Sequence, residues 1–215
     1  MIKAVLFDFD GTIADSSEGI FYTALYTVRK LGIDKEYSEE ELRRFVGPPL
    51  RRCFIEAFNL DESLLDDAVK IYRKEYFRAG MLMMHLYPGI EKLLIDLRKR
   101  GIKTGVASFK MDGLVRKCLG NLGVLQYFDS VHGADENGQL TKGDIINLAI
   151  SDLGEERSSI LMVGDTENDR KGAEDAAVPF LGVSYGFGFR NDGQYDFVVV
   201  PSVPAILSYI EGADK

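Results

Sequence analysis

The chain has 215 residues, enough for one large core or for a core with a smaller second one, because domains commonly contain about 100–200 residues. Apolar residues at 46% and charged residues at 28% are typical of a globular protein and argue against a disordered chain. The net charge of −8, from 34 acidic and 26 basic residues, argues against nucleic acid as the main partner, since binding its backbone needs clustered Lys and Arg. No apolar run approaches the roughly 18–20 residues of a membrane span, so we expect a cytoplasmic protein with no membrane partner.

The first predicted strand covers residues 3–9, "KAVLFDF", and carries two aspartates at its end. Asp8 and Asp10 face one way because side chains alternate along an extended segment. Two carboxylates this close need a cation, a shared proton or a function. Gly11 and Thr12 follow at once and suit a turn that exposes backbone N–H groups.

Helical periodicity dominates the next segment. One apolar stripe is formed by Ile20, Phe21, Ala24, Leu25, Val28 and Leu31. "GPPL" at 47–50 interrupts the pattern and is predicted to start a new helix, because proline suits the first helical turn. The second strand begins only near residue 102, far beyond the dozen or so residues that a crossover needs. We therefore predict a helical cap domain at 16–85, inserted into a core formed by 1–15 and 86–215.

The rest of the chain alternates between short apolar strands and helical patterns. The predicted strands cover 103–108, 130–134, 159–165, 180–185 and 196–200, and helices are predicted at 89–101 and 142–154 among others. Strands that are apolar almost throughout, with helices between them, are typical of parallel sheets covered on both faces. The fold class is therefore predicted as α/β, with a doubly wound, mostly parallel sheet.

Polar side chains stand where several of these strands end, and ligands of open parallel sheets bind beyond the carboxyl ends of the strands. Asp8, Asp165 and Asp169 offer the oxygen ligands that Mg²⁺ prefers. Ser108 and Lys142, together with the N–H groups of the turn after the first strand, can bind phosphate oxygens. A carboxylate that attacks a phosphate dianion is repelled by it, and Mg²⁺ and a lysine would neutralise that repulsion.

Each of these residues also has a structural interpretation. Asp169 can form a capping box with Thr166, and Ser108 can cap or hydrogen-bond a turn. Lys142 is less easily explained in this way, because a lysine in the first turn of a helix opposes the positive end of the helix dipole.

The motifs resemble those of the haloacid dehalogenase-like superfamily of phosphotransferases over almost the entire chain. The residues that carry this resemblance are "DFDGT" at 8–12, "VAS" at 106–108, Lys142 and "GDTEND" at 164–169. Within the superfamily, "DGTIADSSEGI", "VGPPL" and "VSYGFG" look like the phosphoglycolate phosphatase-like branch, which carries a helical C1 cap at this insertion point. The resemblance implies a Rossmann-like core.

The resemblance also implies a role for each matching residue. Asp8 would be the nucleophile that forms an aspartyl-phosphate, and Asp10 the general acid and then the general base. Nearby negative charge is expected to help Asp10 keep the proton that an acid must give. Ser108 and Lys142 would bind the transferring phosphoryl group. The expected Mg²⁺ ligands are the carboxylates of Asp8 and Asp165, the backbone carbonyl of Asp10 and, through water, Asp169.

The expected function is hydrolysis of a small phosphorylated metabolite, with phosphoglycolate as the first guess and pyrophosphate or a nucleoside monophosphate as other substrates. Gly11 and Thr12 are expected to bind the phosphate, and Arg51, one of four arginines around "GPPL", a second anionic group of the substrate. The alternatives are a phosphosugar mutase, in which Asp10 returns the phosphoryl group to a sugar, and a binding protein without turnover. The sequence leaves a monomer and a homodimer open.

Overall fold

The computed structural model describes residues 1–213. The chain divides into two compact units: residues 1–14 together with the chain from Leu86 onward, and residues 15–85. We call the first the α/β unit and the second the helical unit. The two connections between them, β2 (Ala14–Asp15) and β3 (His85–Leu86), pair as a short two-stranded sheet.

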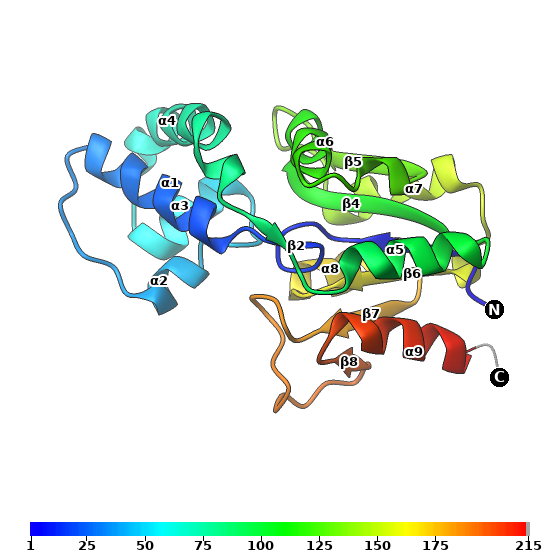
Figure 1. Cartoon of the computed structure of the whole chain (residues 1–215). Helices are drawn as coiled ribbons and strands as arrows, with labels where there is room; N and C mark the ends of the chain where they lie inside the picture. The colour runs from blue at the N-terminus through cyan, green and yellow to red at the C-terminus, as the bar shows by residue number, and fades with distance from the viewer. Residues whose placement is uncertain (214–215) are drawn as a thin grey trace. The chain divides into compact units, whose positions relative to one another are not determined.

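The α/β unit contains a six-stranded sheet in the order β5-β4-β1-β6-β7-β8 (Figure 1). Every neighbouring pair in it is parallel. The strands are β1 (Ala4–Phe7), β4 (Lys103–Met111), β5 (Ser130–Ala134), β6 (Ile160–Gly164), β7 (Phe180–Val183) and β8 (Val199–Val200). From β1 the chain moves outward to β4 and β5 and then returns to the other side of β1 with β6. The end of β1 is therefore the place where a ligand site is expected in such a sheet.

Helices flank this sheet, as predicted for a doubly wound fold (Figure 1). They are α5 (Ile90–Lys99), α6 (Asp112–Asn121), α7 (Lys142–Leu153), α8 (Glu167–Asp175) and α9 (Val203–Ala213), with the short 3₁₀ helices η3 (Leu125–Tyr127) and η4 (Arg157–Ser159). Helix α7 packs against α8, and α5 packs against α9. The predicted fold class is confirmed.

The direction of the side chains along β1 explains where Asp8 points. Ala4 and Leu6 belong to the hydrophobic cluster that α7 and α8 build on the sheet. Because side chains alternate along a strand, Asp8, two residues beyond Leu6, continues on the side of these two helices. Both helices begin at the same edge of the sheet as the end of β1, so their first turns can supply partners for Asp8.

Strand β4 differs from its prediction, because it continues three residues beyond Ser108 to Met111. Its register against β5 shifts between Ala107 and Met111. An irregularity of this kind redirects the side chains of a strand. Here it falls on Ser108, Phe109 and Lys110, the part of β4 that lies beyond its pairing with β1.

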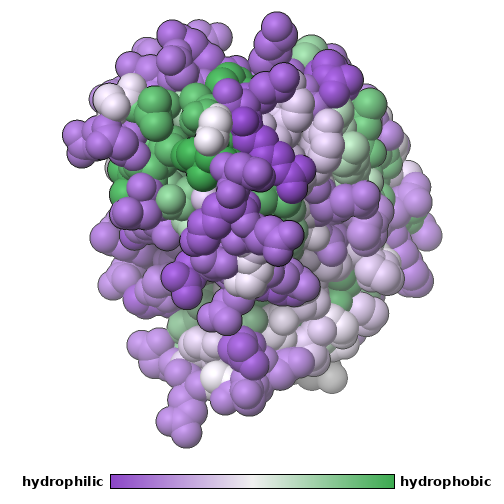
Figure 2. Space-filling view, turned by 90° about the vertical axis from the view of Figure 1, so that its left-hand side faces the viewer, coloured by the Kyte–Doolittle hydropathy of each residue, from purple (hydrophilic) through white to green (hydrophobic). Residues whose placement is uncertain are grey.

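The helical unit contains α1 (Ser17–Lys30), α2 (Glu39–Arg43), α3 (Leu50–Phe58), α4 (Leu65–Arg78) and the 3₁₀ helices η1 (Glu62–Leu64) and η2 (Gly80–Leu82). Its core is rich in aromatic rings in mutual contact: Phe45, Phe54, Phe58, Tyr72 and Tyr76. Helix α3 begins directly after Pro49, which is the capping residue and lies just outside the predicted first turn. Figure 2 shows a mostly hydrophilic face, with hydrophobic residues in its upper half, toward the left and the right.

The buried face of α1 is more polar than the predicted apolar stripe. Thr23 and Thr27 are fully buried, whereas Phe21 and Leu25 lie only at the margin of the buried face. The two hydroxyl groups donate to the backbone carbonyls four residues earlier, at 2.7 and 2.8 Å. These bonds satisfy the hydroxyls without a partner from another helix, so hydrophobicity alone could not identify these positions. Within residues 1–213, no helix has the length and hydrophobicity required to span a membrane.

Candidate active site

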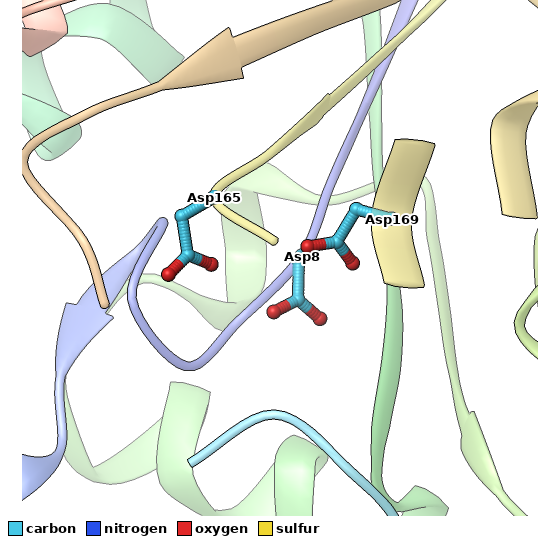
Figure 3. Close-up of side chains that lie close together, drawn as sticks. All are labelled: Asp8, Asp165 and Asp169. Carbon is cyan, nitrogen blue, oxygen red and sulfur yellow. The ribbon is translucent and has the colours of Figure 1, made fainter. Parts of the chain in front are cut away.

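Three carboxylates converge beyond the ends of β1 and β6. Asp8 directly follows β1, and Asp165 directly follows β6. Asp169 lies in the first turn of α8. One oxygen from each lies within 4.8 Å of the others. Figure 3 shows the three carboxylates close together at the ends of these elements. All three residues are buried, with exposed fractions of 7%, 0% and 1%.

Lys142 contacts two of these carboxylates. Its Nζ lies 2.7 Å from Oδ1 of Asp8 and 2.6 Å from Oδ1 of Asp169, and its side chain is 4% exposed. Lys142 is the first residue of α7, which begins after Thr141, whose hydroxyl caps the helix through the N–H of Asp144. The cap fixes the start of α7 and thereby places the lysine beside the carboxylates.

The charges in this cluster do not balance. Burial raises the pKa of Asp8 to about 6, against the opposing effect of Lys142. Burial also raises the pKa of Asp165 well above its ordinary value, and the charges of Asp169 and Asp8 raise it further. Burial lowers the pKa of Lys142, but the same two neighbouring charges, first Asp169 and then Asp8, outweigh burial and raise it. Three carboxylates around one ammonium group leave two negative charges unneutralised.

This surplus and the donor set fit Mg²⁺. A divalent cation would neutralise the two remaining charges, and carboxylate oxygens are the ligands that Mg²⁺ prefers. The fit rests on the three buried aspartates, because one carboxylate oxygen of each lies close enough to the other two for a single ion to bind all three. Asp165 is the carboxylate without a contact to Lys142 among the ion pairs described, so it is the one that most needs the cation.

Asp165 is oriented by a segment that the sequence analysis did not identify. The N–H of Phe187 donates to Oδ2 of Asp165 at 2.7 Å, and the N–H of Phe189 donates to its backbone carbonyl at 2.9 Å. A Cβ at Gly186 would collide with the same carboxylate. Part of the glycine-rich stretch 185–189 belongs to the motif "VSYGFG" that supported the family resemblance, but no contact with the carboxylates was predicted for it. Its alternating glycines were the signal that a backbone approaches another group closely.

The backbone N–H groups of Gly11 and Thr12 are bonded within the turn, whereas the sequence predicted a turn that exposes them. The N–H of Gly11 donates to the carbonyl of Ala14 at 2.9 Å, and the N–H of Thr12 to that of Phe9 at 3.4 Å. The hydroxyl of Thr12 donates to Oδ1 of Asp165 at 3.2 Å. Gly11 has a φ of +85°, and a Cβ there would collide with the Asp165 carboxylate. These donors serve the turn and Asp165, because the turn closes on itself; phosphate binding by the two residues stays a prediction.

Ser108 has a structural contact in the irregular end of β4, and Asp169 combines structural contacts with its place in the cluster. Ser108 is 1% exposed, and its hydroxyl accepts from the N–H of Lys110 at 3.3 Å. Oδ2 of Asp169 accepts from the N–H and the hydroxyl of Thr166, at 3.0 and 2.7 Å, while its Oδ1 contacts Lys142. The capping interpretation of Asp169 therefore applies together with the contact to Lys142, because its two oxygens have different partners.

Asp10 has a cationic partner that the sequence analysis did not identify. Both of its carboxylate oxygens accept from Nζ of Lys110, each at 2.9 Å. Negative neighbours alone were expected around Asp10, and Lys110 changes that expectation. The two residues are 100 positions apart, so only the pairing of β1 with β4 brings them together.

Arg51 lies in the helical unit, where it forms an ion pair with Asp66. The other three arginines around "GPPL" also pair with acidic residues: Arg43 with Glu39, Arg44 with Glu40, and Arg52 with Glu56. Their side chains are half exposed or more, which is typical of solvated helix faces. Substrate binding by Arg51 stays a prediction.

Residues 5–183 match the family model described as "Haloacid dehalogenase-like hydrolase". The chain belongs to this family. It is 33% identical to a 5'-nucleotidase of Pseudomonas aeruginosa, over 87% of this chain and 85% of that protein. It is 29% identical to a phosphoglycolate phosphatase of Aquifex aeolicus, over 92% of each. A predicted phosphatase from Clostridium acetobutylicum has the same fold, with a TM-score of 0.90 and 34% identity over 99% of both chains.

Membership in the haloacid dehalogenase-like family, with phosphatases among both the relatives and the solved structures, identifies the chain as a phosphatase. The predicted family and enzyme class are thus confirmed. The relatives named above differ in the substrate that their names state.

The unbalanced carboxylates predict an unusual dependence of stability on pH. Without a cation, we expect the contribution of Asp8 to the free energy of unfolding, measured as the difference between the wild type and Asp8→Asn, to fall as the pH rises from about 4 to about 6. In this range the folded phosphatase keeps a proton on Asp8 that the unfolded chain has released. The stability that this proton contributes is fully present below the ordinary pKa of an aspartate and is lost as the pH rises through the raised pKa of the folded state. The loss is expected to be on the order of 1–3 kcal/mol.

Urea unfolding at pH 4, 5, 6 and 7, in chelator and in Mg²⁺, measures this dependence. Mg²⁺ is expected to restore the lost stability above pH 6, because it binds the ionised carboxylates of the folded state. The variant Asp165→Asn should depend less on pH and on Mg²⁺. A stability of the wild type in chelator that rises from pH 4 to pH 6 relative to Asp8→Asn would contradict the assigned charge surplus.

Proposed function

We propose that the chain is a Mg²⁺-dependent phosphatase that hydrolyses a small phosphate monoester through an aspartyl-phosphate on Asp8. The observation that carries the proposal is the contact of Lys142 Nζ with Asp8 inside a cluster of three buried carboxylates. A carboxylate with a permanent cation beside it can approach a phosphate dianion that would otherwise repel it. The position of the cluster, beyond the ends of β1 and β6, supports the same assignment.

In the first step, an oxygen of Asp8 attacks the phosphorus atom while the bond from phosphorus to the ester oxygen breaks. The departing oxygen takes a proton from Asp10, so an alcohol leaves and the phosphoryl group stays on Asp8. Lys142 and Ser108 are assigned to the phosphoryl oxygens, where an ammonium and a hydroxyl group donate hydrogen bonds to the charge that is being transferred.

In the second step, Asp10 takes a proton from a water molecule whose oxygen attacks the phosphorus atom. The bond between phosphorus and Asp8 breaks, inorganic phosphate leaves, and Asp8 is a carboxylate again. Asp10 ends with the proton that it gave in the first step, so the cycle is balanced. Each residue thus returns to its starting state after one turnover.

The proposed Mg²⁺ ligands are the carboxylates of Asp8 and Asp165, the backbone carbonyl of Asp10 and, through water, Asp169. When bound, the ion would neutralise charge on the phosphoryl group and on the carboxylates around it. Thr12 and Phe187 support this arrangement by donating to the two oxygens of Asp165. Their removal would therefore weaken metal binding indirectly.

Phosphoglycolate is the first substrate to test, because the 29% identity to a phosphoglycolate phosphatase extends over 92% of both chains. A nucleoside monophosphate is the second, because of the 33% identity to a 5'-nucleotidase. We propose that residues 16–85 act as the cap domain that selects among such substrates.

A panel of phosphoglycolate, pyrophosphate, nucleoside monophosphates and sugar phosphates tests the proposal through release of inorganic phosphate. We expect release from one class, dependent on Mg²⁺ and abolished by chelator. Conversion of a sugar phosphate to its isomer, without phosphate release, would identify a mutase. A protein that binds Mg²⁺ but turns over no substrate of the panel in either assay would argue for a binding protein.

A further inference from the structure

We propose that Lys110 is a positioning residue, which orients the carboxylate of Asp10 for both of its proton transfers. The inference rests on the proposed function, since it assigns Lys110 a part in the work of Asp10. It comes from one contact, the double hydrogen bond from Lys110 Nζ to the two carboxylate oxygens, each 2.9 Å long.

The burial of this pair distinguishes it from the other ion pairs on the surface of the protein. The side chains of Lys110 and Asp10 are 6% and 15% exposed, whereas those of the pair Arg43–Glu39 are 50% and 70% exposed. A lysine this deeply buried loses its hydration, so it is stable there only with a good partner. The ring of Phe9, whose centroid lies 5.3 Å from Nζ, adds a further favourable contact.

The irregular end of β4 explains how the lysine reaches Asp10. The register shift lies between Ala107 and Met111, and the N–H of Lys110 donates to the hydroxyl of Ser108 within it. The ring of the residue between them, Phe109, has its centroid 5.5 Å from Nζ of Lys142. Ser108 is itself assigned to the reaction, and the next two residues of the strand, Phe109 and Lys110, contact Lys142 and Asp10.

Orientation matters here because Asp10 has two tasks. One oxygen must meet the leaving group and later a water molecule, and misplacement by about 1 Å can cost roughly 100-fold in rate. Asp10 follows the end of β1 and has a short, rotatable side chain. A cation bonded to both oxygens restricts the plane of the carboxylate, which a single hydrogen bond could not do.

The test compares two substrates that differ in their need for a proton. An alkyl phosphate releases an alkoxide, which must be protonated, whereas p-nitrophenyl phosphate releases a stabilised anion, which need not be. Single-turnover mixing with rapid quench measures release of the alcohol or phenol, and so isolates the first step. Lys110→Met is expected to slow release from the alkyl phosphate roughly 10–100-fold and release from p-nitrophenyl phosphate much less, with KM little changed.

The controls separate positioning from damage to the fold. Lys103, on the same strand, contacts Glu155 at 2.9 Å with a 44% exposed side chain, and Lys103→Met should leave both rates unchanged. Lys110→Arg keeps the charge and should recover part of the lost rate. The double variant Asp10→Asn/Lys110→Met removes both charges, so it keeps the test possible even if Lys110→Met alone does not fold.

A residue that acts through Asp10 should have no further effect once Asp10 is altered. The double variant is therefore expected to match Asp10→Asn in both rates. An additional loss, or equal slowing of both substrates by Lys110→Met while Asp10→Asn is selective, would overturn the inference and leave the proposed function intact. If Asp10→Asn itself is not selective, the role of Asp10 fails and the inference fails with it.

Discussion

Replacing Asp8 by asparagine is expected to lower the rate of phosphate release by roughly 10⁴-fold or more, a loss typical of a removed nucleophile. The amide is a poor nucleophile and has lost the charge that a metal ligand supplies. Asp8 is buried next to Lys142. A neighbouring carboxylate could take over as the nucleophile only if that carboxylate moved into the position of Asp8. Phosphate release by the purified variant, with its best substrate and saturating Mg²⁺, measures the effect.

This loss should not come from unfolding. Because burial raises the pKa of Asp8 to about 6, its charge destabilises the metal-free protein at pH 7, and Asp8→Asn should be at least as stable as the wild type there. Asp96→Asn, on α5, is the matched control and should keep full activity. Substantial turnover by a folded Asp8→Asn would exclude Asp8 as the nucleophile.

Replacing Lys142 by methionine has the second largest expected effect and should reduce both activity and stability. The substitution leaves Asp8 and Asp169 buried without the ammonium group that contacts both. Removing one partner of a buried ion pair typically costs about 3–5 kcal/mol, and activity is expected to fall by roughly 10³-fold. Urea unfolding and steady-state kinetics measure the two losses.

The exposed pair between Lys92 and Asp96 supplies the comparison for this stability loss. Lys92 is 78% exposed, so Lys92→Met should cost less than about 1 kcal/mol. The cost of Lys142→Met should shrink as the pH falls towards and below about 6, where Asp8 takes up a proton and no longer needs a cation. A cost near that of Lys92→Met at pH 7 would contradict the arrangement of charges described here.

The main elements of the α/β unit could be predicted from the sequence because they depend on local patterns. The strand predicted at 130–134 has those bounds in the structure, and the helix predicted at 142–154 covers Lys142–Leu153. The carboxylates of Asp8 and Asp165 could be located because parallel strands end at one edge, whatever the details of packing. Topology alone was sufficient for these residues.

The partners of these carboxylates could not be predicted in the same way. Lys110 reaches Asp10 through a register shift in β4, and an irregularity of that kind has no signature in the hydrophobic pattern. Phe187 contributes a backbone N–H to Asp165, so its side chain gives no indication of this role. Hydrogen bonds from the backbone and from irregular strand ends depend on the assembled fold.

The central claim is that a phosphoryl group passes through Asp8. Mixing the protein with Mg²⁺ and its best substrate, quenching with acid within milliseconds and mapping the phosphorylated peptide by mass spectrometry tests it directly. We expect phosphate on Asp8 of the wild type, lost again as turnover ends, and none on the Asp8→Asn variant. Phosphate release without any phosphorylated peptide, or with phosphate on another residue, would contradict the account.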